Sequence, residues 1–146
     1  MIFTEEPTGF KYNLEIVGCF LENEGKFLLL HRVKEESQGN TWGVPGGKVE
    51  KGEHYINATC RELLEETGIK VPYKKMRYWG RVFVRYPESD FIYHISSAKY
   101  VAGNQITLNP KEHKDYRWVT PKEALGMNLI LDEDACIKLF YKVIYL

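Results

Sequence analysis

The sequence lacks a surplus of charge of either sign. Its 146 residues carry 20 lysines and arginines and 20 aspartates and glutamates, so the formal net charge is zero at neutral pH. Proteins that bind by neutralising long stretches of nucleic-acid backbone carry a basic surplus. The charge balance therefore argues against that class. It does not argue against small phosphorylated ligands, which need only a few local charges or a metal.

The chain also lacks paired cysteines and long hydrophobic runs. Cys19, Cys60 and Cys136 are widely spaced and odd in number, which argues against a disulfide framework and favours free thiols in a reducing compartment. No apolar run approaches membrane-spanning length, and residues 1–13 show no basic segment followed by an apolar one, as a signal peptide would. We therefore expect a soluble, cytoplasmic protein with no membrane partner.

Apolar segments separated by turn-forming residues predict the strands. Residues 14–21 and 26–33 are expected to be antiparallel, because the Asn-Glu-Gly sequence between them tolerates the positive φ of a hairpin turn. The aromatic and β-branched runs 78–86 and 91–100 predict two more long strands. Residues 117–119 predict a short strand. Together these segments indicate a mixed or antiparallel sheet.

The periodicity of residues 54–67 predicts a helix. Leu63 and Leu64 belong to its expected apolar stripe, and Gly68 stands where a glycine ends a helix in the left-handed conformation. Before this helix, Pro45 and the two glycines after it predict a tight turn or a main-chain contact with phosphate. The helix therefore follows a turn that a ligand can approach closely.

The last third of the chain predicts a loop and two helices. Residues 109–116 are expected to be a polar loop, 120–123 read as a capping box that opens a brief helix, and 132–145 have the spacing of an amphipathic helix. Because no internal repeat or linker is visible, residues 1–146 are expected to form a single domain. The predicted fold class is α/β, a sandwich with a mixed sheet between helices.

Three carboxylates crowd the helix at 54–67. Residues three and four apart share one helical face, so Glu62, Glu65 and Glu66 are expected on one exposed acidic strip. Like charges at such spacings repel, and Arg61 alone does not offset them. A hard divalent cation with oxygen ligands is the natural partner. The alternative is a solvated acidic face without a metal.

The stretch that contains this strip resembles the Nudix box. It matches the box at every fixed position, with Gly47, Glu53 and the run Arg61-Glu62-Leu63-x-Glu65-Glu66-x-Gly68-Ile69. The resemblance implies the Nudix fold, an α/β/α sandwich with a mixed sheet, over nearly the whole chain. It also implies Mg²⁺ or Mn²⁺ as the cofactor and the hydrolysis of a pyrophosphate linkage by activated water.

The resemblance implies roles for the charged residues of the box. Glu66 and Glu62 are the principal expected metal ligands, and Glu65 is a further one. Glu62 and Glu65 are also expected among the catalytic carboxylates, because a glutamate near the metal can take the proton of water. Arg61 is expected to pair with a glutamate and to orient it.

Members of the family also use a carboxylate from a later loop as a metal ligand or general base. By this resemblance Glu112 is the better candidate and Asp115 the weaker one, and a solvated loop charge is the alternative interpretation of Glu112. The four histidines form no cluster with metal-ligand spacing, so we interpret them as surface residues or as residues satisfied by local contacts.

The expected partner is a small nucleotide. An aromatic face can stack on a base, and fixed cations can meet phosphates. The candidate substrate contacts are Gly46, Gly47, Arg32, Phe83 and Tyr86. The alternatives are a plain tight turn for the glycines, a solvated charge for the arginine, and packing in the core or at the surface for the aromatic residues. No nucleic-acid partner is expected. A homodimer is left open, because members of the family are often dimers.

The sequence therefore predicts a Mg²⁺-dependent pyrophosphohydrolase that cleaves a nucleoside diphosphate linked to another group. The preferred substrate is a (deoxy)nucleoside triphosphate, cut to the monophosphate and pyrophosphate. Nucleotide sugars, including ADP-ribose, and dinucleoside polyphosphates are the alternative substrates. The alternative from another class is a nucleotide-sensing Nudix module without catalysis, and the intact box argues against it.

Overall fold

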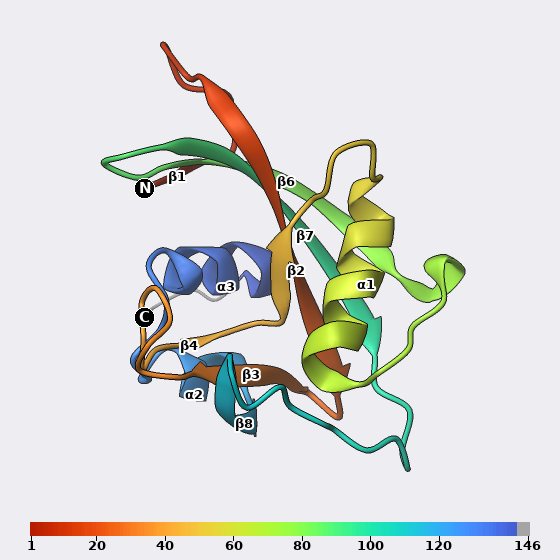
Figure 1. The fold of residues 1–146 in the computed structure, drawn as a ribbon. Helices are drawn as coiled ribbons and strands as arrows, with labels where there is room; N and C mark the ends of the chain where they lie inside the picture. The colour runs from red at the N-terminus through yellow and green to blue at the C-terminus, as the bar shows by residue number, and fades with distance from the viewer. Residues whose placement is uncertain (143–146) are drawn as a thin grey trace.

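Strand β2, Tyr12–Asn23, runs through the middle of the structure (Figure 1). The structure is a computed structural model that describes residues 1–142. β2 lies parallel to β7, Asp90–Lys99, and meets β3, Lys26–Arg32, in an antiparallel hairpin. At the hairpin turn Glu24 and Gly25 have φ angles of 51° and 79°, as the turn residues predict.

The remaining strands extend this sheet on both sides. β6, Arg77–Arg85, pairs with β7, and the short β1, Ile2–Phe3, pairs with β6. β8, His113–Val119, and β4, Trp42–Gly43, both pair with β3. Because the β2–β7 pair is parallel and the others are antiparallel, the sheet is mixed, which confirms the predicted fold class.

The two longer helices cover opposite faces of the sheet. In Figure 1, α1, Tyr55–Thr67, and α3, Glu133–Tyr141, lie on either side of β2. One hydrophobic cluster joins α1 to the sheet and another joins α3 to it. Neighbouring residues of β2 supply both clusters because side chains alternate along a strand: Phe20 packs towards α3, and Cys19 and Leu21 towards α1. The expected α/β/α sandwich is therefore confirmed.

The ends of α1 follow the sequence closely. The His54 side chain accepts a hydrogen bond from the Ile56 N–H, and Gly68 has a φ of 76° and donates its N–H to the Leu64 carbonyl. The prediction that Leu64 belongs to the buried stripe was wrong, because its side chain is 45% exposed. Leu63 is fully buried, and the next residue points about 100° away around the helix.

Two segments are more regular than the sequence indicated. The glycine stretch expected as a tight turn contains strand β5, Gly46–Lys48, which pairs with Ile16–Gly18 of β2. The expected loop 109–116 ends early, because β8 begins at His113 and pairs along the edge of β3. In both places pairing with a distant strand satisfies the main chain, which local sequence does not reveal.

The last described helix, α3, ends before the end of the predicted helix 132–145. α3 ends at Tyr141, and Lys142 has a φ of 51°; residues 143–145 of that prediction lie outside the described residues. The capping box is confirmed, because the brief α2, Pro121–Ala124, and its reciprocal Thr120–Glu123 hydrogen bonds are present. A 3₁₀ turn, Tyr73–Lys75, follows α1. None of the described helices is long and apolar enough to cross a membrane.

Candidate functional site

Glu66 lies on the inward face of α1. Its exposed fraction is 7%, and its Oε1 accepts a hydrogen bond of 2.7 Å from the main-chain N–H of Gly46. Burial, reinforced by the carboxylates of Glu62 and Glu112, raises the pKa of Glu66 to about 8. The expectation of a wholly exposed acidic strip was therefore wrong for this residue.

Glu66, Glu112 and His113 come together although they are distant in sequence. Each offers a ligand atom, and these atoms lie within 4.8 Å of one another. Glu112 immediately precedes β8, and His113 is its first residue. Two carboxylates and an imidazole are suitable donors for a divalent cation. This cluster joins two of the predicted metal ligands to one residue that the sequence did not indicate.

His113 was misinterpreted as a surface or satisfied histidine. Its exposed fraction is 5%, and among the described residues its Nδ1 has no hydrogen-bond partner. Burial and the nearby Arg32 lower the pKa of His113 to about 4, so the ring is neutral at neutral pH and keeps a free lone pair. Its position directly after Glu112 was the only sequence signal that His113 lies in this cluster.

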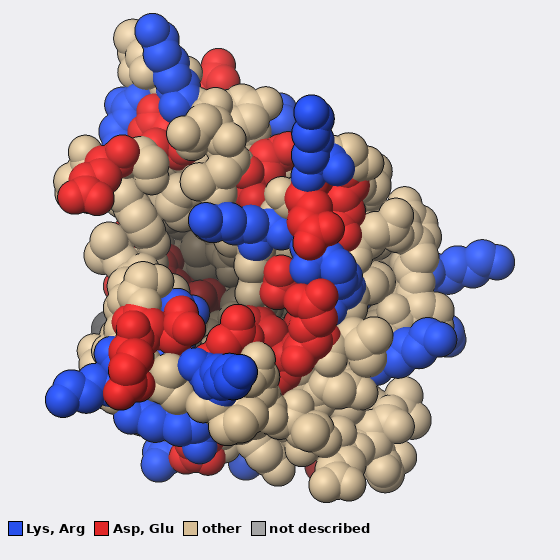
Figure 2. Space-filling view, in the orientation of Figure 1, with Lys and Arg blue, Asp and Glu red and all other residues tan. Residues whose placement is uncertain are grey.

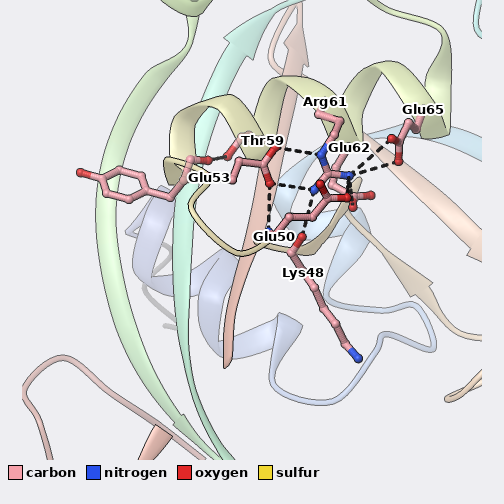
Figure 3. A network of polar contacts seen from close by, with 8 residues as sticks. Lys48, Glu50, Glu53, Thr59, Arg61, Glu62 and Glu65 are labelled. Carbon is pink, nitrogen blue, oxygen red and sulfur yellow. Dashed lines mark hydrogen bonds and ion pairs between the residues drawn. The ribbon is translucent and has the colours of Figure 1, made fainter. Parts of the chain in front are cut away.

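Arg61 ties the carboxylates of Glu53, Glu62 and Glu65 together (Figure 3). Its guanidinium donates to Glu53 at 2.9 Å and to Glu62 at 2.9 Å, and it reaches Glu65 at 3.3 Å. A further bond of 3.0 Å reaches the carbonyl of Lys48 in β5. The pairing lowers the pKa of Glu53 and raises that of Arg61. The prediction that Arg61 pairs with a glutamate is confirmed, and its role in orienting that glutamate stays a prediction.

Gly47 leaves room for the Glu62 carboxylate. A Cβ atom at Gly47 would lie 2.4 Å from the Glu62 carboxyl carbon, a distance that side chains cannot tolerate. Glu62 is held in this gap with a side-chain exposure of 15%, and burial raises its pKa against the opposing effect of Arg61. Glu65, with 57% exposure, faces solvent instead. Glu62 and Glu66 therefore face the interior one helical turn apart.

A pocket of about 370 Å³ extends from these carboxylates into the molecule. Glu66, His113, Gly46 and Gly47 line it together with Arg32, whose Nε donates 2.8 Å to the Ser37 carbonyl. Figure 2 shows a hollow on this face, with acidic side chains gathered beside it over α1. The polar cluster and the pocket therefore form one continuous site.

Of the other candidate residues, the structure places Tyr86 at the pocket and leaves Phe83 and Asp115 out of its lining. Tyr86 lines the pocket and donates its hydroxyl to the Leu131 carbonyl at 2.9 Å, and burial raises its pKa to about 12. Phe83 is not among the lining residues; it is buried, and its ring meets that of Phe10 at 5.3 Å. Asp115 is exposed and accepts from the N–H of Tyr116, outside the cluster around Glu112.

The comparison with protein families identifies the family of this chain. The NUDIX domain model matches residues 13–140. The chain is 34% identical over 114 residues to the CTP pyrophosphohydrolase of Escherichia coli (strain K12), covering 77% of this chain and 79% of that protein. It is 33% identical over 95 residues to the NAD-capped RNA hydrolase NudC of Haemophilus influenzae (strain PittEE), and this match spans 34% of that longer protein.

Solved structures show the same architecture. The MutT protein from Methanosarcina mazei Go1 superposes with a TM-score of 0.77 and 30% identity, covering 93% of this chain and 97% of that chain. The NUDIX domain of Shewanella oneidensis NrtR complexed with ADP ribose superposes with a TM-score of 0.73 at 22% identity, covering 95% and 93%, a likeness of fold alone. From the box on α1, the fold around it and these matches, we conclude that the chain belongs to the NUDIX family and is a Nudix hydrolase.

Proposed function

We propose that this Nudix hydrolase is a divalent-metal-dependent pyrophosphohydrolase that cuts a (deoxy)nucleoside triphosphate to the monophosphate and pyrophosphate. The observation that carries the proposal is the cluster of Glu66, Glu112 and His113 at a pocket of about 370 Å³, a size typical of small-ligand sites. The CTP pyrophosphohydrolase that is 34% identical supports a triphosphate substrate. A cytoplasmic location, supported by three free thiols, belongs to the same proposal.

The residues present fit Mg²⁺ or Mn²⁺. Glu66, Glu112 and His113 would hold the ion, with Glu62 beside Glu66 and the Glu65 carboxylate further out. A bound ion lowers the pKa of coordinated water and offsets the charge of the phosphates. Among residues 1–142 the Nδ1 of the buried His113 has no hydrogen-bond partner, which costs free energy unless a ligand completes it.

Other groups at the site hold the carboxylates in place, contact the phosphates or accept the proton of water. The Gly46 N–H holds one oxygen of Glu66, and Arg61 holds Glu62 and Glu65 in fixed directions. Arg32, fixed by Ser37, places a permanent positive charge at the pocket wall, where it can meet a phosphate. We assign Glu112 to accept the proton of the attacking water, with Glu62 as the nearby alternative.

A nucleotide panel with both metals tests the proposal. Canonical nucleoside and deoxynucleoside triphosphates, ADP-ribose, a nucleotide sugar and a dinucleoside polyphosphate are incubated with Mg²⁺, Mn²⁺ or EDTA, and both products are identified. We expect metal-dependent turnover with a triphosphate as the best substrate. If every compound is left intact while one binds tightly, the chain is a nucleotide sensor and the proposal is wrong.

Gly47→Ala is expected to lower kcat by about tenfold or more, because the new Cβ displaces the Glu62 carboxylate. Gly47 does not have a positive φ, so the substitution adds no backbone strain. Gly126→Ala is the matched control, since its Cβ meets its nearest neighbour at an ordinary 3.6 Å. Steady-state kinetics of both variants measure the effect, and full activity of Gly47→Ala would show that the position of Glu62 is unimportant.

Glu112→Gln is expected to reduce turnover more than Asp115→Asn. Glu112 belongs to the cluster with Glu66 and His113, whereas Asp115 is exposed and bonded to a neighbouring main-chain N–H. We expect a loss of about 10²-fold or more for Glu112→Gln, the usual range for a catalytic proton acceptor, and less than about threefold for Asp115→Asn. The reverse order in kcat would transfer the role to Asp115.

A further inference from the structure

The zero net charge of the chain conceals an uneven distribution of its charges. Between Glu66 and Glu88 the sequence carries six basic residues and no acidic one. The basic residues are Lys70, Lys74, Lys75, Arg77, Arg81 and Arg85. The total charge, on which the expectation of no nucleic-acid partner depends, therefore does not describe this segment.

Most of these cations lie at an open edge of the sheet. The 3₁₀ turn Tyr73–Lys75 leads into β6, whose residues 77–81 pair with β7 on one side. On the other side β1 pairs only with Phe83 and Val84, so within the described residues the first half of β6 has no second neighbour. Figure 1 shows this segment beside α1, on the side away from α3, and the charged side chains on that flank of Figure 2 are basic.

Within the described part of the chain, five of the six cations have no carboxylate partner. Arg85 is the exception, and it pairs with Asp90 at 3.0 Å. Arg81 is exposed and lies over the ring of Phe83, 5.3 Å from its centre. The other four are exposed and form no side-chain hydrogen bond or ion pair with any of residues 1–142, namely Lys70, Lys74, Lys75 and Arg77. Like charges close together repel one another, so a polyanion that lies along this edge is attracted by all of them.

Exposed aromatic rings are interleaved with these cations. Tyr73, Tyr78 and Trp79 are 53%, 38% and 41% exposed. The Tyr78 ring packs against Tyr55 of α1, with 4.6 Å between the ring centres. The Trp79 ring instead meets Phe140 of α3, at 6.2 Å. Because α1 and α3 cover opposite faces of the sheet, the edge presents an aromatic surface on each of its two faces.

Strand β6 is distorted where Trp79 lies. The register of β6 against β7 shifts between Tyr78 and Gly80, so Trp79 has no register partner there. Such a bulge re-aims a side chain and is common at sheet edges. An open edge with an exposed apolar ring invites pairing with other chains, and lysine or arginine beside it prevents such pairing. Protection of the edge is therefore the alternative role of these cations.

The combination of cations and rings fits a single-stranded nucleic acid. Such a strand has phosphates for the cations, and its bases can stack on any aromatic face without regard to sequence. Because the strand is flexible, it can follow the edge and turn bases towards either face. An anionic membrane is flat and reaches rings on one face only, which Tyr78 and Trp79 do not share. A duplex keeps its bases stacked on each other, so it offers phosphates alone.

We propose that this edge, formed by residues 70–81, binds single-stranded RNA or DNA without sequence preference. The exposed cations meet the phosphates, and Tyr73, Tyr78 and Trp79 stack on bases. None of these residues lines the nucleotide pocket or belongs to the metal-binding cluster around Glu66. The edge is therefore a second site, and binding there does not depend on the proposed hydrolysis.

Fluorescence anisotropy with labelled oligonucleotides measures this binding. Oligouridylate and oligodeoxythymidylate of about 12 nucleotides are titrated with the protein in EDTA, which prevents hydrolysis. At physiological salt we expect a Kd of about 10⁻⁶ to 10⁻⁴ M for both strands. The logarithm of the association constant is expected to fall with the logarithm of salt concentration with a slope of about −3, as about four or five neutralised phosphates require. A duplex of the same length is expected to bind about fivefold more weakly, because its bases cannot stack on the rings.

Two variants separate the phosphate contacts from the stacking. Lys74→Glu combined with Lys75→Glu reverses two unpaired charges, so we expect binding about 30-fold weaker or more and a salt slope shallower by about 1.4. Tyr73→Ala removes an exposed ring, so we expect binding about tenfold weaker with the slope unchanged. Lys34→Glu combined with Lys122→Glu is the matched control, because both lysines are exposed and follow β3 and β8, across β2 from β6. This control is expected to bind within about threefold of wild type.

Hydrolysis of nucleoside triphosphates keeps this test apart from the proposed function. Turnover is expected to be unchanged in all three variants, because their substitutions lie outside the lining of the pocket. If no triphosphate is hydrolysed while oligonucleotide binding depends on the two lysines and on Tyr73, the proposed function alone is wrong.

Other results overturn the inference. Absence of oligonucleotide binding by the wild type, or equal binding by the variant with Lys74 and Lys75 reversed, would mean that the cations only protect the edge. Equal binding by Tyr73→Ala, or binding of inorganic polyphosphate as tight as that of the oligonucleotides, would reduce the edge to a surface for any polyanion. Sedimentation with phosphatidylserine vesicles that the lysine substitutions abolish, without oligonucleotide binding, would assign the edge to a membrane. A preference of more than about tenfold for RNA or for DNA would contradict recognition by phosphates and base faces alone.

Discussion

Glu66→Gln is expected to lower kcat for nucleotide hydrolysis by about 10³-fold or more, with the fold intact. The amide keeps the shape of the side chain and can still accept the 2.7 Å hydrogen bond from the Gly46 N–H. It cannot provide the anionic oxygen that a hard divalent cation requires. Loss of one preorganised electrostatic group in an active site typically costs about 10²- to 10³-fold, and the loss of a metal ligand lies at or beyond that limit. Steady-state kinetics at saturating Mg²⁺ measure it.

The stability of this variant separates a missing ligand from a damaged fold. Burial raises the pKa of Glu66 in the folded protein to about 8, above its usual value of 4.5. The folded state therefore holds a proton that the unfolded state releases, so this contribution to stability is present below pH 4.5 and is lost as the pH rises through about 8. A neutral glutamine avoids the loss. In EDTA at pH 8 we expect a Tm for Glu66→Gln equal to or above that of wild type, and a lower Tm would mean that activity was lost through unfolding.

Arg61→Met is expected to have the second largest effect, on stability and activity together. The guanidinium bonds to Glu53, Glu62 and Glu65 and to the Lys48 carbonyl, so it ties α1 to the loop before it and to β5. Methionine fills part of the space but leaves these carboxylates facing one another. Because the ion pairs are partly exposed, we expect the free energy of unfolding to fall by about 2–3 kcal/mol and kcat by about 10- to 100-fold.

Urea unfolding and kinetics under stabilising conditions distinguish these effects. Lys51→Met removes an exposed positive charge from the neighbouring loop and serves as the control, with little change expected in either quantity. If excess Mg²⁺ restores the Tm of Arg61→Met but not its kcat, the arginine acts by orienting Glu62. Normal kcat in a folded Arg61→Met would contradict that positioning role.

The local parts of the fold were predictable because their signals are local. The hairpin at Glu24 and Gly25, helix α1 with its end at Gly68, and the Thr120 capping box depend on residues within one or two turns of each other. Strand β5 could not be predicted in this way, because its pairing partner is the distant strand β2. Leu64 was misplaced because the apolar stripe of α1 is narrower than its sequence indicates.

The residues of the site also fall into those that local sequence indicates and those that only the fold brings together. The spacing of Arg61, Glu62 and Glu66 indicates a metal site because it is fixed by helix geometry. The position of His113 beside Glu66 depends on burial by strands and loops that meet only in the folded protein. Before folding is considered, His113 looks like any loop histidine. The carboxylates expected to hold the metal were therefore accessible from sequence, whereas the buried histidine beside them was not.

The measurement that tests the central claim most directly is ³¹P NMR of a nucleoside triphosphate treated with the wild-type protein. The claim is that the cluster around Glu66 supports metal-dependent cleavage between the α- and β-phosphates. With Mg²⁺ we predict that the triphosphate signals are replaced by those of the monophosphate and pyrophosphate, and that EDTA or Glu66→Gln prevents the change. Formation of the diphosphate and orthophosphate, or equal product formation in EDTA, would contradict the account.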